Sequence, residues 1–296
     1  MTKTRLAVLA LLAVGFFWGA AFVLMKDAIA QQPYMDFLAT RFTLAALAMA
    51  ALRPRVAFNF QPGDSRYGAI AGVVLALGYI TQTIGLDMTT AATSGFLTGL
   101  YVVLTPLFAW LVMRQRIGVK VAIGVTLAMI GLGIFSGAAS DIEFQVGQLW
   151  LIICAIFYAI HILVLGKYGK GRSSYRFAML QIVWAAIVTW GFALADGYQP
   201  PPNFEVWFAV LFTALLSTVL AFWIQTWAQT LLEPARVALL ITSEVLFTAI
   251  IAVAVGQEPI TFAMIFGGGL MFIAMLVVEW PSKKSPDLPL ETQLHE

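Results

Sequence analysis

The feature that most constrains this chain is a series of ten long apolar segments. A helix needs about 20 apolar residues to cross the hydrocarbon core of a bilayer, which is about 30 Å thick. Each of these segments has about that length, and short polar connections separate them. They are residues 6–25, 35–52, 68–86, 91–113, 119–137, 148–166, 176–195, 206–228, 235–256 and 260–279. The sequence therefore predicts an all-α membrane protein with ten transmembrane helices.

The composition excludes several other classes of protein. Hydrophobic residues make up 61% of the 296 residues and charged residues only 11%, whereas soluble proteins average about 25% charged residues. This balance excludes a soluble enzyme, a disordered protein and a nucleic-acid-binding protein. The partners to expect are therefore the lipid bilayer and a small-molecule substrate, with no nucleic acid.

The basic residues indicate an orientation. Lysine and arginine concentrate in the cytoplasmic loops of membrane proteins. With ten spans and a cytoplasmic N-terminus, 15 of the 17 basic residues fall in cytoplasmic segments, and only Lys26 and Arg41 do not. We therefore expect a multi-pass protein of the bacterial inner (plasma) membrane with both termini cytoplasmic and the 196–205 connection outside. The polar tail, residues 281–296, is expected to be disordered and cytoplasmic.

A weak internal repeat divides the chain into two halves. Residues 79–105 resemble residues 222–248 at an offset of 143. Each half holds five spans, and because five is odd, the second half enters the membrane from the opposite side. Inverted repeats of this kind are common in secondary transporters. The sequence thus predicts two inverted five-helix repeats, residues 1–140 and 141–280.

Single positions support this division. Arg116 and Glu258 lie at nearly equivalent places after the fourth and ninth spans, one basic on the expected cytoplasmic side and the other acidic on the outer side. Other equivalent pairs are polar or aromatic residues at membrane depth: Tyr101 with Glu244 at an offset of 143, and Trp18 with Tyr158 and Arg41 with Gln181 at an offset of 140.

Short stretches of both halves also resemble a known family. FWGAAF at 17–22, GFLTGLY at 95–101 and SEV at 243–245 resemble EamA-type members of the drug/metabolite transporter superfamily. Over residues 6–280 this resemblance implies ten helices in two inverted repeats that export small metabolites such as amino acids, with the bacterial amino-acid exporters as one candidate branch. Val245 replaces a proline usual in the family and Arg116 replaces an acid, which leaves the subfamily open.

Polar side chains within the spans are the candidates for a substrate site. Polar groups at this depth are costly, and they face either a cavity or a neighbouring helix. In the fourth span, for example, Ser94, Thr98 and Tyr101 form one stripe at helical spacing. The alternative is that such groups hold packed helices together by hydrogen bonds. The substrate-binding candidates are Trp18, Arg41, Tyr79, Gln82, Ser94, Thr98, Tyr101, Tyr158, His161, Gln181, Trp184, Gln225 and Glu244.

Two of these candidates can carry a charge inside a span. Glu244 lies about 13 Å into the ninth span at 1.5 Å per residue, where an isolated charge costs at least ~2.5 kcal/mol. We expect it to bind a substrate amine or to change its protonation, or else to make a structural hydrogen bond. Arg41 could bind a substrate carboxylate through its planar guanidinium, or it could extend to the membrane surface or have a structural role.

These features favour a secondary transporter. The sequence contains no phosphate-binding loop, dinucleotide fingerprint, zinc motif or nucleophilic serine motif, so we expect no catalytic residue, cofactor or metal. The leading hypothesis is export of amino acids, aromatic or neutral, by alternating access through a central cavity. The alternative is multidrug efflux of lipophilic cations, and an intramembrane enzyme acting on a lipid is more remote. The oligomeric state stays open, with a monomer among the options.

Overall fold

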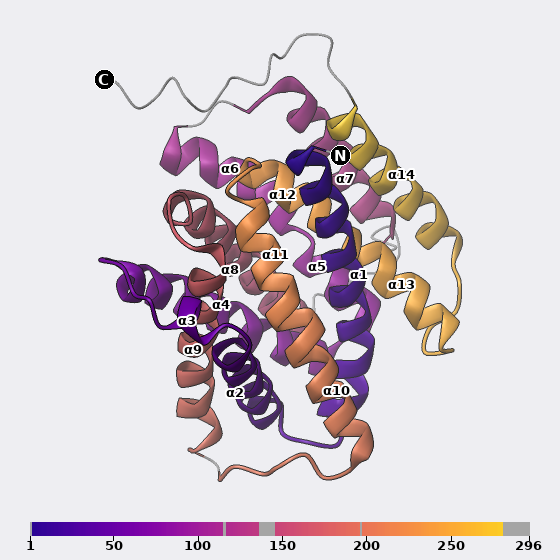
Figure 1. The fold of residues 1–296 in the computed structure, drawn as a ribbon. Helices are drawn as coiled ribbons and strands as arrows, with labels where there is room; N and C mark the ends of the chain where they lie inside the picture. Colours follow the sequence, from indigo (N-terminus) through magenta and orange to yellow (C-terminus); the bar gives the residue numbers. More distant parts are fainter. Residues whose placement is uncertain (1, 115–116, 136–145, 196, 281–296) are drawn as a thin grey trace, which may run out of the picture.

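The structure is a computed structural model that describes residues 2–114, 117–135, 146–195 and 197–280, and the regular elements in these ranges are helices (Figure 1). The first half contains α1 (Lys3–Ile29), α2 (Tyr34–Leu52), α3 (Pro54–Ala57), α4 (Asp64–Met88), α5 (Ala91–Thr98), α6 (Tyr101–Met113) and α7 (Val119–Phe135). The second contains α8 (Val146–Tyr168), α9 (Ser174–Ala193), α10 (Phe204–Ala214), the π-helical turn η1 (Leu215–Leu220), α11 (Ala221–Ala228), α12 (Pro234–Ile241), α13 (Ser243–Ala254) and α14 (Phe262–Glu279).

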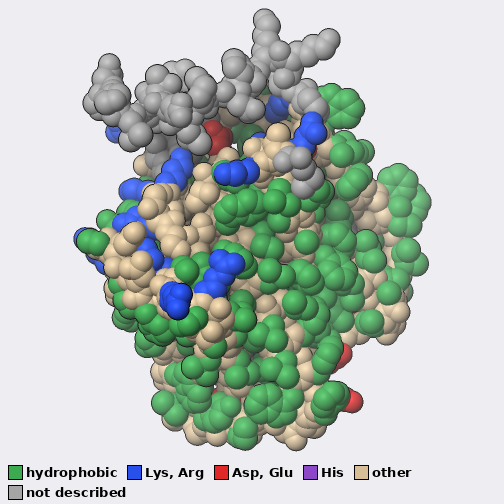
Figure 2. Space-filling model, in the orientation of Figure 1, with side chains coloured by type: hydrophobic (Ala, Val, Ile, Leu, Met, Phe, Trp, Pro, Cys, Tyr) green, Lys and Arg blue, Asp and Glu red, His purple; other side chains and the backbone are tan. Residues whose placement is uncertain are grey.

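The predicted fold class is confirmed. Within the described residues, nine helical segments are long and apolar enough to cross a membrane, and Val119–Ile134 is a shorter apolar helix. Three of the nine consist of consecutive helices, namely α5 with α6, α10 with η1 and α11, and α12 with α13. The face seen in Figure 2 is covered largely by hydrophobic side chains, as expected of a surface in contact with lipid.

Local sequence signals determine where several of the helices begin. Thr2, Thr90, Ser173, Asn203 and Thr261 each accept a hydrogen bond from the backbone N–H three residues further on. Such N-caps satisfy one of the backbone donors that a helix start leaves free. They therefore set the first residues of α1, α5, α9, α10 and α14.

The helix packing follows the order expected of two inverted halves. α1 packs against α11 and α13, and its counterpart α8 packs against α4 and α6. α2 packs against its own counterpart α9, and α7 packs against α14. The start of α1 and the end of α14 lie at the same end of the bundle (Figure 1). With the shorter α7 counted as a span, each half contributes five spans, so the two halves run through the bundle in opposite directions.

The fourth and ninth spans are interrupted at equivalent points. α5 gives way to α6 at Gly99 and Leu100, and α12 gives way to α13 at Thr242, which is 143 residues after Gly99. The first interruption comes directly before Tyr101, and the second comes two residues before its counterpart Glu244. Interrupted helices at corresponding positions of two repeats are where transporters of this architecture bind their substrates.

Two predictions fall on residues outside the described ranges: the role of Arg116, and the tail over 281–296. The expected partner of Arg116 in the repeat, Glu258, is described. Its Oε1 accepts the backbone N–H of Ala92 at 3.0 Å. This contact ties the connection between α13 and α14 to the start of α5.

Candidate substrate cavity

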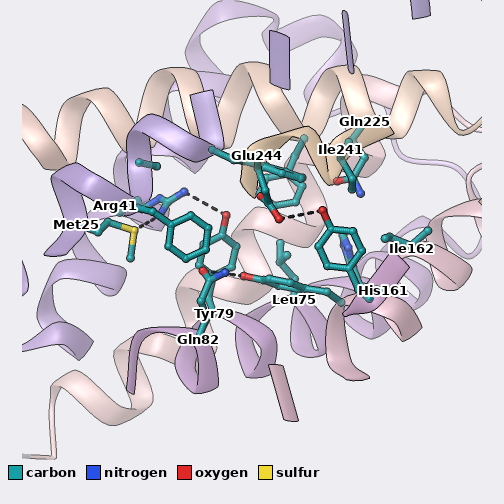
Figure 3. Close-up of a pocket in the computed structure, with 16 residues that line it drawn as sticks. Met25, Arg41, Leu75, Tyr79, Gln82, His161, Ile162, Gln225, Ile241 and Glu244 are labelled. Carbon is teal, nitrogen blue, oxygen red and sulfur yellow. Dashed lines mark hydrogen bonds between the residues drawn. The ribbon is translucent and has the colours of Figure 1, made fainter. Parts of the chain in front are cut away.

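A cavity lies between the two halves, with walls from α1, α2, α4 and α6 of the first half and α8, α11, α12 and α13 of the second (Figure 3). Its volume is about 40 Å³. A water molecule needs about 10–15 Å³ of such space, so the cavity has room for a few waters. A larger molecule can bind there only if the surrounding helices move apart.

Most of the predicted site residues line this cavity, although they are spread over the whole chain. The repeat had already paired several of them across the two halves. The cavity-lining candidates are Trp18, Arg41, Tyr79, Gln82, Tyr101, Tyr158, His161, Gln225 and Glu244.

Two candidates from the fourth span do not line the cavity. Ser94 and Thr98 are both fully buried in α5, and the Ser94 hydroxyl lies 2.8 Å from the Thr89 hydroxyl. The predicted stripe assumed one continuous helix through Tyr101. The structure instead ends α5 at Thr98 and begins α6 at Tyr101, and of these three residues only Tyr101 lines the cavity.

Gln181 and Trp184 on α9 also lie outside the lining. Gln181 lies behind His161, with its Oε1 2.6 Å from His161 Nε2, and its Nε2 donates to Thr226 Oγ1 at 3.2 Å. Trp184 packs against Gly72 of α4, where even an added Cβ would find no room. Gln181 thus supports a lining residue, and Trp184 joins α9 to α4.

The site prediction omitted the apolar part of the wall. Apolar residues in an apolar helix carry no signal of their own, because lipid, core and cavity favour the same side chains. One usable signal was the helical spacing in α1 of Ala21, Phe22 and Met25 after Trp18. The omitted lining residues are Ala21, Phe22, Met25, Leu75, Ile162, Phe222 and Ile241.

Arg41 is held inside the bundle. It is 1% exposed, its Nε donates to Thr218 Oγ1 at 2.9 Å, and its Nη2 donates to the Tyr79 hydroxyl at 3.2 Å. The guanidinium carbon also lies 4.7 Å from the centre of the Tyr79 ring, a favourable cation–π distance. The alternative that Arg41 extends to the membrane surface is therefore wrong. Thr218 belongs to the π-helical turn η1, and such turns occur frequently at functional sites.

Glu244 is 4% exposed, and its Oε1 accepts a hydrogen bond of 2.9 Å from the Tyr101 hydroxyl. Its other carboxylate oxygen makes no hydrogen bond within the described ranges. Neither Glu244 nor Arg41 belongs to any ion pair of the described residues. A cation and an acid therefore face one cavity without neutralising each other.

The rest of the wall combines aromatic rings with a few polar groups. Tyr158 donates to Gln82 Oε1 at 3.1 Å. The Tyr79 ring lies 5.7 Å from that of Tyr158 and 6.2 Å from that of Phe222, centre to centre. In the part of the chain that the structure describes, no three His, Cys, Asp or Glu side chains are grouped to hold a metal. The wall of the cavity is therefore partly aromatic and partly polar.

Inverted halves, paired helix interruptions and polar groups around an intramembrane cavity define a membrane transporter. The comparisons with known proteins identify the family. Residues 5–137 and 145–280 each match the EamA-like transporter family. The chain therefore belongs to that family, within the drug/metabolite transporter superfamily.

Two of the similar proteins are named as uncharacterized transporters. An uncharacterized transporter of Archaeoglobus fulgidus is 30% identical over 277 residues, which are 93% of this chain and 86% of the relative. The uncharacterized transporter YvbV of Bacillus subtilis is 26% identical over 201 residues, which are 67% of this chain and 64% of the relative. A protein of known crystal structure has a TM-score of 0.77 at 16% identity, over 93% of this chain and 96% of that one. This last likeness shows the fold alone.

Proposed function

We propose that this transporter exports small zwitterions, namely aromatic or neutral amino acids, by alternating access through the central cavity. The observation that supports this most directly is that Arg41 and Glu244 line one cavity without pairing with each other (Figure 3). An amino acid carries the two complementary charges on neighbouring atoms. Its carboxylate would accept from the Arg41 guanidinium, and its amine would donate to the free oxygen of Glu244.

The remaining lining residues favour the same class of substrate. The aromatic and aliphatic side chains around the two charges suit an apolar amino-acid side chain. Efflux of lipophilic cations, the alternative, needs an acid and aromatic walls, which are present. However, Arg41 on the same cavity would repel a cation, and in so dry a site that repulsion is weakly screened.

We also propose that both termini face the cytoplasm of a bacterial cell. Lysine and arginine side chains gather over the upper and left parts of the molecule in Figure 2, whereas the lower right shows acidic side chains and no basic ones. Arg53 and Lys170 lie in connections at the former end and Arg66 lies in the first turn of α4, whereas Glu258 lies in a connection at the latter end. Both proposed repeats, residues 1–140 and 141–280, line the same cavity, so a monomer would suffice for transport.

Three related radiolabelled compounds test the proposal on the purified protein in liposomes: phenylalanine, phenethylamine and 3-phenylpropionate. They share the ring and differ only in whether they carry both charges, the amine or the carboxylate. We expect transport of phenylalanine and little of the other two, because each lacks one contact worth about 1.5–3 kcal/mol. Faster transport of phenethylamine than of phenylalanine would favour cation efflux.

Variants of the two charged residues sharpen this test. Glu244→Gln should transport phenylalanine with a KM raised by about one to two decades and should gain no transport of the amine. Arg41→Gln removes the repulsion, so that phenethylamine should become a better substrate than it is for the unaltered protein. If both variants transport phenylalanine normally, the proposed site is wrong.

A further inference from the structure

Gln225 has a buried oxygen without a partner on the wall of the cavity. The residue is 1% exposed and lines the cavity, and its Oε1 finds no hydrogen-bond donor in the described ranges. A hydrogen-bond acceptor that is buried without a donor destabilises the protein by the full desolvation free energy of that group. A donor on a bound molecule would remove that cost.

The position of Gln225 relative to the two charges defines which part of a substrate it would meet. In Figure 3 Arg41 lies on one side of Glu244, and Gln225 lies on the other with His161. The carboxylate and amine of an amino acid are adjacent, so a substrate held by Arg41 and Glu244 directs its side chain toward Gln225. His161 Nε2 donates to Gln181 Oε1, and at this end Gln225 Oε1 is the lining acceptor that is fully buried without a donor among the described residues.

We propose that Gln225 selects amino acids whose side chain ends in a hydrogen-bond donor, with tyrosine preferred over phenylalanine. The proposal rests on the function proposed above and adds a specificity-determining residue to it. The donor has to be at the far end of a long side chain, because Gln225 lies beyond Glu244 as seen from Arg41. The hydroxyl of threonine is too short to reach it.

The test is the ratio of KM values for two pairs of amino acids in liposomes. Tyrosine should have a KM about three- to tenfold below that of phenylalanine, the range of one net hydrogen bond, and threonine should gain no such advantage over valine. Gln225→Met keeps the side-chain length and removes the acceptor. This variant should prefer phenylalanine, because the phenol would then be buried without a partner.

Gln229→Met is the matched control. Gln229 is a buried glutamine one turn further along the chain, and its Oε1 is also unpartnered in the described ranges, but it does not line the cavity. The preference for tyrosine should persist in this variant. Equal KM values for tyrosine and phenylalanine, or a preference that survives Gln225→Met, would overturn the role of Gln225 and leave the proposed function standing. Absence of transport for every amino acid would overturn both.

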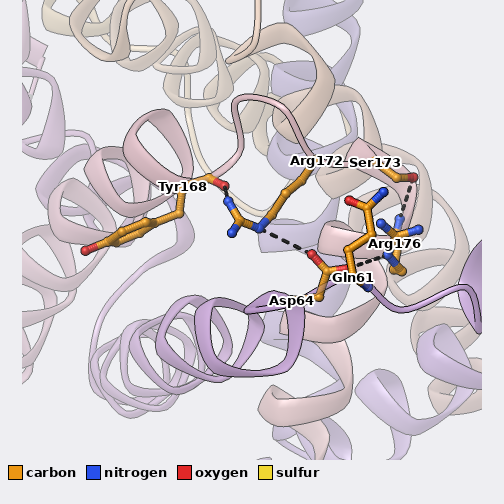
Figure 4. Close-up of polar contacts among 6 residues, drawn as sticks. All are labelled: Gln61, Asp64, Tyr168, Arg172, Ser173 and Arg176. Carbon is orange, nitrogen blue, oxygen red and sulfur yellow. Dashed lines mark hydrogen bonds and ion pairs between the residues drawn. The ribbon is translucent and has the colours of Figure 1, made fainter.

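A second, independent observation concerns the end of the bundle where α4 and α9 begin (Figure 4). Asp64, the first residue of α4, pairs with Arg176 Nε at 2.5 Å and Arg172 Nε at 3.3 Å. The backbone N–H of Gln61 also donates to it at 2.9 Å. Asp64 and Arg176 are buried. Because Asp64 belongs to the first half and both arginines to the second, this ion-pair cluster joins the halves.

The opposite end is joined by weaker contacts at an equivalent place. The counterpart of Arg176 at the offset of 140 is Asp36, and each is the third residue of its helix. Asp36 Oδ2 accepts the backbone N–H of Gln199 at 2.9 Å, and the Thr40 hydroxyl lies 2.8 Å from the Tyr198 hydroxyl. The end at Asp36 is thus joined by hydrogen bonds to neutral groups, whereas the end at Asp64 is joined by ion pairs.

We infer that the Asp64–Arg172–Arg176 cluster closes the entrance of the cavity at the end where α4 and α9 begin, and separates when that entrance opens. The inference rests on the proposed function, in which access to the cavity alternates between the two ends, and the small volume of the cavity means that the helices must move apart before a larger molecule can enter. Ions that separate into incoming water regain their hydration, so an ion pair can open reversibly at a water-filled entrance. Because ion pairs join the halves at this end and only hydrogen bonds to neutral groups join them at the other, the entrance at the Asp64 cluster is the more tightly closed of the two.

Labelling of a cysteine inside the cavity tests whether the Asp64–Arg172–Arg176 cluster acts as such a gate, that is, whether it closes this entrance. In a Cys154→Ala background, Leu75→Cys places a single thiol on the cavity wall, and a membrane-impermeant maleimide is added at the α4 and α9 end. Asp64→Asn or Arg176→Gln should raise the labelling rate by about fivefold or more, the effect of a coupling of about 1 kcal/mol. The exchanged pair, Asp64→Arg with Arg176→Asp, should restore the slow rate.

Arg236→Gln is the matched control. Arg236 pairs with Glu279 through two contacts of 2.6 and 2.5 Å at the same end, but both residues belong to the second half. Its loss should leave labelling unchanged. The gate is overturned if neither single variant labels faster, or if Arg236→Gln labels equally fast. It is also overturned if the exchanged pair labels at the rate of the single variants, because that result would indicate general loosening of the fold.

Discussion

The hydroxyl of Tyr101 donates a hydrogen bond of 2.9 Å to Oε1 of Glu244, and the two residues occupy equivalent positions of the two halves. Each lies just after the interruption of its span, at the start of α6 and near the start of α13. Equivalent positions of inverted repeats can touch only close to the axis that relates the repeats. The cavity beside this hydrogen bond therefore lies close to that axis, and both halves contribute residues to its wall.

The first prediction concerns the charge of Glu244. Glu244→Gln keeps the size and the hydrogen-bonding capacity and removes the negative charge. Loss of a charge-assisted contact to the substrate amine should raise KM by about one to two decades, which corresponds to ~1.5–3 kcal/mol. Stability in detergent should change little, because an amide is less costly to bury than a carboxylate.

Tyr101→Phe is the companion variant. It removes the donor and keeps the carboxylate, so its effect on KM should be smaller, about threefold to tenfold. Transport by Glu244→Gln with unaltered rate and KM would exclude Glu244 from the substrate site.

The second prediction tests the cavity by filling it. Ala21 lines the cavity and is almost fully buried, and Ala21→Leu adds three carbon atoms to a space of about 40 Å³. Transport should fall by an order of magnitude or more, since the added atoms take the place of the substrate. Ala13→Leu on the same helix points to the exposed surface and should transport normally. Equal transport by the two variants would argue against this cavity.

The third prediction concerns the stability of the contact between α1 and α13. A Cβ added at Gly19 would lie 2.7 Å from both Phe247 Cβ and the Thr248 backbone nitrogen, which is too close for any side chain. Gly19→Ala should therefore lower the stability by about 1–3 kcal/mol, measured by thermal unfolding in detergent. Gly269→Ala in α14, where no described atom lies within 4 Å of the added Cβ, should have no such effect. If Gly19→Ala left the midpoint of thermal unfolding unchanged, α1 and α13 would have to pack less closely than the structure shows.

The fourth prediction concerns the orientation in the membrane. Gln199 and Lys170 are exposed and lie in connections at opposite ends of the bundle. A cysteine at Gln199 should react with an impermeant reagent added outside intact cells, and one at Lys170 should react only in inverted vesicles. The native Cys154 is buried and should contribute little background. Reaction of both cysteines from the same side would show that the number of crossings between them is even.

The predicted polar stripe in the fourth span shows where sequence reasoning reached its limit. Ser94, Thr98 and Tyr101 are aligned on an ideal helix, but the structure directs only Tyr101 into the cavity. Gly99 in the first half and Thr242 in the second are the sites of interruption. Neither residue type by itself specifies a break inside an apolar segment, so the interruption was not predictable from the spacing.

Arg41 illustrates a second limit. Its place in the sequence is compatible with a side chain extended to the membrane surface or turned inward. The choice depends on Thr218 and Tyr79, which lie 177 and 38 residues away along the chain. Contacts at such separation exist only once the helices have packed.

The sequence by itself determined the spans, their approximate ends and the presence of a repeat. The reason is that crossing a bilayer requires only a sufficient length of apolar chain, a property of each segment alone. Tertiary structure alone decided which polar residues share the cavity and which, like Ser94 and Gln181, are buried behind its walls. That outcome depends on the rotation of each helix about its axis, on the interruptions within two spans and on the neighbour that each helix meets, and none of these is a property of a single segment.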